Sequence, residues 1–220
     1  MPASDLAGNP LTQAVTLTYL DPASSPLHYS TLGMWTKPSA VSTIWSEVGG
    51  PFSAGVLTRG MDFPTIDTAS YDGFFIGRYA TSDTTDLSLP PPGTYIVGAN
   101  AHVVVVNGAI TSFSTSNTHI RREEMGGGVL MDPVAEPRLD LSTTTAMAIT
   151  QPPTSNAFEG GGGTLTNGFV MGANGQIGGA FYGPPAATMP FAPPELGGSL
   201  AVGTVNQKMR MVGSFGLKTP

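Results

Sequence analysis

Three histidines are the side chains of this sequence best suited to hold an iron-containing ligand: His28, His102 and His119. An imidazole nitrogen is a common axial ligand of haem iron. Arg121 and Arg122 follow His119 closely, and their guanidinium groups match the propionates of a haem. His28 lies in a segment rich in aromatic residues, whose rings suit a porphyrin plane. The competing interpretation is that the histidines are solvated or hydrogen-bonded residues, and His102, at the start of a valine run, is typical of an ordinary strand position.

Enzyme and metal-site motifs are missing from the sequence. It contains no Gly-x-Ser-x-Gly elbow, no His-Glu-x-x-His pair and no phosphate-binding loop. The absence of cysteine excludes disulfides, thiolate metal sites and a cysteine nucleophile. The acidic pairs Asp67/Asp72 and Asp83/Asp86 lack the dense oxygen spacing of a calcium loop. We therefore expect a non-enzymatic protein without a metal-ion site.

The composition is typical of an extracellular β protein. Charged residues occupy 11% of the 220 positions, and the net charge is −6. The few lysines and arginines are scattered, which argues against a nucleic-acid-binding surface. No stretch is long and apolar enough for a membrane-spanning helix. Residues 1–5 lack the basic and apolar regions of a signal peptide, so we expect any leader or lipid anchor to lie outside the given chain.

Alternation of apolar and polar residues with a period of two predicts strands along most of the chain. The strand-like runs are 14–20, 28–35, 52–58, 73–81, 95–106, 109–114, 138–149, 164–171, 176–182, 197–205 and 209–217. Asn107-Gly108 and Asn174-Gly175 are typical of two-residue hairpin turns, and Gly160–Gly163 predicts a hairpin tip or a bulge. Many short antiparallel strands favour closure into a barrel, which removes exposed edges. We predict an all-β protein with one antiparallel barrel of about eight strands over 51–220 and an N-terminal β segment over 1–50 packed on it.

The last third of the chain carries a distinctive pattern of glycines, aromatic residues and prolines. It consists of Phe158-Glu159-Gly160, then Gly178-Gly179-Ala180-Phe181-Tyr182-Gly183-Pro184-Pro185-Ala186, then Glu195-Leu196-Gly197-Gly198-Ser199-Leu200. This pattern resembles the signature of the transferrin-binding protein B β-barrel family, and the resemblance extends over residues 52–218. The sequence departs from the family pattern in a longer segment between Ala186 and Glu195 and at Leu200, where the family usually has phenylalanine. The glycines are typical of the bulged, close-packed backbone at the corners of a small barrel.

The resemblance implies a non-enzymatic binding protein, secreted or on the outer-membrane surface of a Gram-negative bacterium, that serves iron or haem acquisition. Its partner would be a small ligand, haem among the candidates, or a host or surface protein. The alternative is a structural or adhesive surface protein that binds another protein through its long loops, 120–137 and 183–196. The candidate contact residues of those loops are Glu123, Glu124, Met189 and Phe191.

Overall fold

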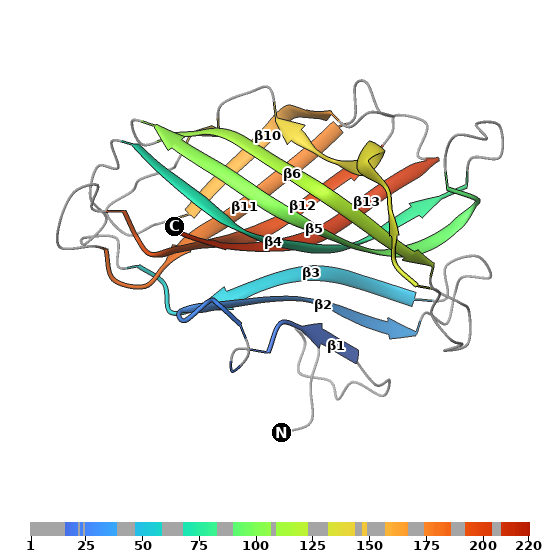
Figure 1. Cartoon of the computed structure of the whole chain (residues 1–220), viewed down its shortest axis with the longest axis horizontal. Coiled ribbons are helices and arrows are strands. Elements are labelled where there is room, and N and C mark those ends of the chain that lie inside the picture. Colours follow the sequence, from blue (N-terminus) through green and yellow to red (C-terminus); the bar gives the residue numbers. More distant parts are fainter. Residues whose placement is uncertain are drawn as a thin grey trace, which may run out of the picture.

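The chain folds into two antiparallel β-sheets that lie against each other (Figure 1). The computed structural model describes residues 16–21, 23, 25–38, 47–58, 68–82, 90–106, 109–122, 132–143, 147–148, 157–166, 174–185, 192–203 and 208–220. Within these residues a ten-stranded sheet surrounds the core, and a three-stranded sheet covers part of its outside. The all-β prediction is confirmed. The predicted division of the chain after residue 50 stays a proposal, and one strand of the small sheet, β3 (Glu47–Gly55), runs across that position.

The described strands divide between the two sheets in chain order. The small sheet has the order β1-β2-β3 and contains, besides β3, β1 (Thr16–Tyr19) and β2 (Ser30–Pro38). The large sheet contains β4 (Thr68–Thr81), β5 (Gly93–Val106), β6 (Ala109–Arg122), β7 (Val134–Ala135), β8 (Ser142–Thr143), β9 (Met147–Ala148), β10 (Ala157–Thr166), β11 (Asn174–Tyr182), β12 (Glu195–Gly203) and β13 (Met209–Lys218). A short 3₁₀ turn, η2 (Pro137–Leu139), lies between β7 and β8.

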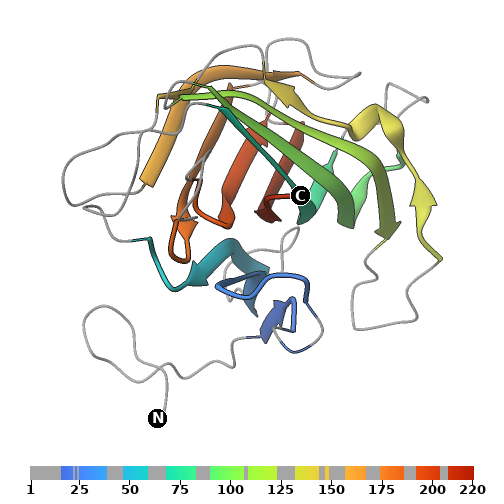
Figure 2. The ribbon, with the colours of Figure 1, turned by 60° about the vertical axis from the view of Figure 1, so that its left-hand side comes forward.

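The large sheet curves until its two ends meet (Figure 2). Its main order is β5-β4-β13-β12-β11-β10, and β6 pairs with the free side of β5. In the described residues, β8 provides the link between β6 and β10: it pairs with Leu165 and Thr166 of β10 and with Ser114 of β6. The predicted barrel is therefore a strongly curved sheet whose ends are joined by a two-residue strand rather than by a long ladder.

Aromatic side chains fill the interior of the curved sheet. The largest fully buried rings are Tyr71, Phe75, Phe113, Phe158, Phe181 and Phe215. Ring centroids lie 5.1 Å apart for Phe113 and Phe215 and 5.8 Å apart for Phe158 and Phe181, within the range of favourable aromatic pairs. The Tyr71 hydroxyl donates a hydrogen bond of 3.0 Å to the carbonyl of Pro193, and burial raises the pKa of Tyr71. The interior is thus occupied by side chains, as expected for a barrel of this size.

Interior glycines make room for these rings. A Cβ atom on Gly213 would lie 2.3 Å from Cζ of Phe75, and one on Gly198 would lie 2.7 Å from Cζ of Phe215. The β11–β12 ladder runs without a register shift through both glycine pairs of the sequence signature. The bulges expected at these pairs are therefore absent, and close approach of the Phe158 and Phe215 rings explains Gly179 and Gly198 instead.

The hairpin predictions succeed at one position and fail at another. Val106 ends β5 and pairs with Ala109 at the start of β6, so the hairpin around Asn107-Gly108 is confirmed. Asn174-Gly175 is not a turn, because both residues begin β11 and pair with β12. The glycine run is part of β10, and its ladder with β11 shifts register between Gly161 and Thr164, so the bulge alternative is the correct one.

The small sheet sits directly on the outer face of β12 and β13 (Figure 1). Gly216 faces outward from β13, and a Cβ atom there would lie 2.7 Å from the δ-carbons of Leu27 and Leu32. The hydroxyl of Ser214 donates a hydrogen bond of 2.9 Å to the carbonyl of Gly33. The absence of a side chain at Gly216 therefore lets the two sheets approach closely.

Glu195 is the main polar anchor between the two sheets. This carboxylate is only 2% exposed at the start of β12. It accepts hydrogen bonds from the main-chain N–H groups of His28 and Tyr29, the latter at 3.1 Å, and from the hydroxyl of Ser30 at 2.7 Å. These bonds fix the point at which the chain enters β2, and with it the position of the small sheet.

Candidate functional site

The three histidines lie on the outer surface of the molecule. His102 and His119 point outward because the next residues along β5 and β6, Val103 and Ile120, are buried. His28 precedes β2 and is exposed, while its main-chain N–H is held by Glu195. A ligand bound by any of them would therefore lie on the outside of the curved sheet.

The three histidines stand on separate parts of the outer surface. His119 pairs with Gly98, four residues from His102 along β5, which corresponds to roughly 13 Å. Three strand spacings, roughly 14 Å, separate His102 from Glu195, which holds the main chain of His28. In the described part of the chain, no group of three or more His, Cys, Asp or Glu residues could hold a metal ion. A haem held by one of these histidines would lie on the outer surface beside that residue.

His119 has the geometry best suited to that role. Its Nδ1 lies 2.8 Å from the carbonyl oxygen of Asn117. When Nδ1 carries the proton, this bond orients the ring and leaves Nε2 available, as in metal-binding histidines held by a carbonyl. Arg121 is two residues further along β6 on the same face and is half-buried. Gly98, opposite His119, has open space where a side chain would stand.

Arg122 does not join this group. Arg122 alternates to the opposite side of β6 from Arg121, and its Nη2 donates a hydrogen bond of 3.4 Å to the carbonyl of Pro92. Glu123, Glu124, Met189 and Phe191, the candidate residues of the long loops, lie outside the described residues.

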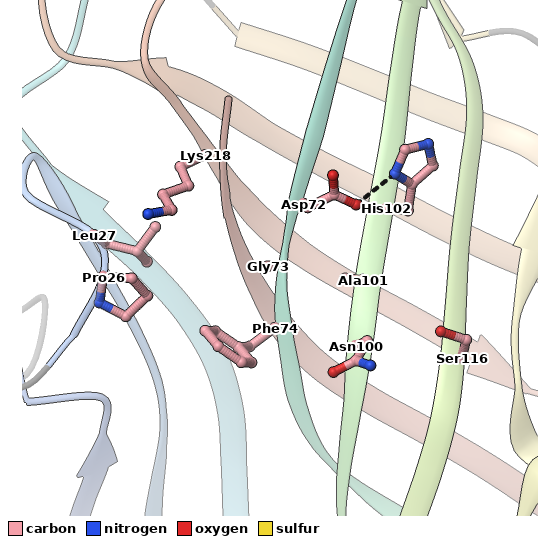
Figure 3. A pocket seen from close by; sticks show the side chains of 10 residues that line it. All are labelled: Pro26, Leu27, Asp72, Gly73, Phe74, Asn100, Ala101, His102, Ser116 and Lys218. Atoms are coloured by element: carbon pink, nitrogen blue, oxygen red, sulfur yellow. Dashed lines mark hydrogen bonds and ion pairs between the residues drawn. The ribbon is translucent and has the colours of Figure 1, made fainter. Parts of the chain in front are cut away.

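His102 lines a groove at the junction between the curved sheet and the segment before β2 (Figure 3). Its Nδ1 lies 2.7 Å from Oδ1 of Asp72. The groove has a volume of about 450 Å³. Its lining includes Phe74, Asn100 and Ser116 from β4, β5 and β6, Lys218 from β13, and Leu27.

The outward side of the small sheet is a second candidate surface. Leu17 and Tyr19 of β1 are 58% and 56% exposed. Leu17 pairs with Trp35, and the ring of Trp35 covers Gly50. Tyr19 pairs with Gly33, and the ring of Phe52 covers Gly33. The alternate residues of β2 and β3 contact the large sheet: Leu32 meets Gly216, and Ser53 bonds to the Tyr182 hydroxyl. We name Leu17, Tyr19, Trp35 and Phe52 the aromatic face.

Comparison with solved structures identifies the architecture. Two structures of mutants of the vaccine antigen Transferrin Binding Protein B (TbpB) from Haemophilus parasuis are similar to this chain, with TM-scores of 0.52 and 0.51 and sequence identities of 16% and 15%. The alignments cover 89% and 93% of this chain. The fold is that of a TbpB-like β-lobe. The fold expected from the glycine and aromatic signature is thereby confirmed.

The TbpB-like lobe spans 33% and 37% of those two chains, about a third of their length. At these identities the likeness concerns the fold. No protein-family model matches the chain, and no curated protein is similar to it in sequence. The described residues contain no helix that is long and apolar enough to span a membrane.

Sequence reasoning missed both the groove and the aromatic face. One signal was available: Phe74 and Phe75 are neighbours in a strand, so one of the two rings has to point outward. Leu17 and Tyr19 alternate with threonines, but that pattern does not tell which side of the strand is covered. The partners that complete each surface come from other strands and follow from the sheet topology.

Proposed function

We propose that this TbpB-like lobe is a non-enzymatic binding protein on the outer surface of a Gram-negative bacterium, where it takes part in iron acquisition. Its partner in this proposal is an iron-carrying protein, bound through the aromatic face. The observation that carries the proposal is the combination of a TbpB-like fold with an exposed apolar surface on its accessory sheet. TbpB itself is named for binding transferrin.

The aromatic face has the chemistry of a protein-binding surface. Tyrosine and tryptophan dominate the binding energy of many interfaces because they bury a large area at low cost in side-chain entropy. Exposed apolar residues that are contiguous, rather than scattered, mark such surfaces. The anchor at Glu195 and the contact at Gly216 support the sheet from behind, so the face does not have to become ordered when it binds.

Binding to iron-loaded transferrin, measured by biolayer interferometry, tests this proposal. We expect the double variant Leu17→Ser/Tyr19→Ser to weaken binding by about ten-fold or more, because both side chains lose their buried contact area. Val134→Ser is the matched control, since Val134 is 63% exposed but lies on β7 of the large sheet. Absence of binding by the wild-type lobe, or equal binding by the double variant and the control, would refute the proposal.

His119 favours haem as a second candidate ligand. Its Nδ1 contact with Asn117, the nearby Arg121 and the open space at Gly98 suit one axial ligand and one propionate. Titration with haemin should then give a shifted Soret band that saturates at one equivalent and is lost in His119→Ala. His102→Ala is the control, because this residue is separated from His119 by several positions along the sheet and should keep the band. A spectrum equal to the sum of free haemin and protein would exclude haem.

A further inference from the structure

We propose that the groove between the curved sheet and the segment before β2 binds a short, neutral saccharide. The groove is lined by Leu27, Phe74, Asn100, Ser116 and Lys218, together with the hydrogen-bonded pair Asp72–His102 (Figure 3). Its volume of about 450 Å³ falls in the range of small-molecule sites, roughly 300–1,000 Å³. This site is separate from the aromatic face, which lies on the other side of the small sheet.

The apolar part of the groove is a flat ring next to an aliphatic wall. Phe74 is 41% exposed, although most aromatic side chains of the curved sheet point into its core. Leu27 approaches from the segment before β2 and limits the groove on the opposite side. A sugar ring carries C–H groups on one face, and this face packs on an aromatic ring while the hydroxyls remain at the edge.

The polar part of the groove offers side chains that are not engaged within the described structure. Asn100 and Ser116 are cross-strand partners, both are exposed, and neither makes a side-chain hydrogen bond to another described residue. An amide and a hydroxyl each donate and accept, as sugar hydroxyls do. The β5–β6 ladder shifts register between Gly98 and Asn100, beside Asn117 with its φ of 55°. Bulges of this kind commonly re-aim side chains at binding sites.

The charges of the groove favour a ligand without net charge. The Asp72 carboxylate is turned toward His102, whereas the Lys218 ammonium points toward Leu27 (Figure 3). One cation and one anion on neighbouring strands therefore face the same cavity from different directions. A simple anion would be attracted by Lys218 but repelled by Asp72, and the reverse holds for a cation. Hydroxyl groups can bond to both side chains, which is why a saccharide fits better than an ion.

Saturation-transfer NMR with D-glucose, D-galactose, N-acetyl-D-glucosamine and lactose as probes tests the site, with benzoate as the anionic counter-probe. We expect at least one sugar to bind the wild-type lobe. Phe74→Ala and Asn100→Ala should each weaken its binding by about ten-fold or more, whereas Phe74→Tyr should keep it, because the flat ring remains. Val134→Ser serves again as the exposed apolar control, and thermal melting of every variant shows whether the fold is intact.

Three results would overturn the saccharide site. The first is no signal from any sugar with the wild-type lobe. The second is sugar binding that both groove variants retain. The third is binding of benzoate alone, lost in Lys218→Ala, which would assign the groove to organic anions. Phe74→Ala should leave binding to transferrin unchanged. The sugar measurements therefore test the groove, and the transferrin measurements test the proposed function independently.

Discussion

Replacing Glu195 by alanine is expected to lower the free energy of unfolding by about 3 kcal/mol. The variant would leave the N–H groups of His28 and Tyr29 and the hydroxyl of Ser30 without their shared acceptor. Each unsatisfied buried donor costs about 1–3 kcal/mol, and the loss of the carboxylate also leaves a cavity. The small sheet should then separate from the curved sheet before the core unfolds.

Urea unfolding followed by tryptophan fluorescence measures this effect, because Trp35 reports on the small sheet. The unfolding midpoint of Glu195→Gln should lie between those of wild type and Glu195→Ala. The amide keeps one oxygen acceptor, but it places an N–H₂ group among the donors of residues 28–30. Asp132→Asn is the matched control: this carboxylate is exposed, and its removal should change stability by less than about 0.5 kcal/mol. Equal unfolding midpoints for wild type and Glu195→Ala would contradict the anchoring role.

Gly213→Ala is expected to destabilise the core by about 3 kcal/mol, an unusually large effect for one added methyl group. The new Cβ would lie 2.3 Å from Cζ of Phe75 and 2.6 Å from the carbonyl oxygen of Ile76. The ring cannot retreat freely, because Phe75 is only 1% exposed, and the carbonyl belongs to the backbone of β4. Either the ring or the β4–β13 ladder has to shift.

Gly98→Ala provides the comparison for Gly213→Ala. No atom lies within 4 Å of a Cβ placed on Gly98, so this variant should stay within about 0.5 kcal/mol of wild type. Thermal melting and urea unfolding of both variants give the difference directly. If the two substitutions lowered the free energy of unfolding equally, the effect would come from the backbone preferences of glycine and alanine in strands. The packing of the Phe75 ring over Gly213 would then contribute nothing to stability.

The fold was predictable where a strand carries a regular alternation. β4 shows it clearly: Tyr71, Phe75 and Tyr79 are buried, and the residues directly before and after each of them are more exposed. Glycine-rich strands were harder to predict from the sequence. The run Gly160–Gly163 and the pair Asn174-Gly175 have the composition of turns, yet both lie in strands that pair with neighbouring strands of the large sheet.

The candidate sites depend on which strands become neighbours, and local pattern does not determine this. The groove needs β13 beside β4, which brings Lys218 next to Asp72. The aromatic face needs the pairing of β1 with β2, which brings Tyr19 next to Gly33. Sequence reasoning identified the histidines as chemically capable groups, but the topology decides that they lie apart.

The pairing of β4 with β13 also affects how the chain folds while the ribosome synthesises it. Thr81 pairs with Met209 and Asp72 with Lys218, so one edge of β4 has no partner until the ribosome has produced the residues in between. At roughly 5–20 residues per second, this delay is on the order of ten seconds. During that time this edge of β4 can pair with other nascent chains, so it is exposed to aggregation. A circularly permuted gene that begins with β13 would encode this strand before β1 to β4, so β4 would find its partner already made without a change in any contact between the two strands.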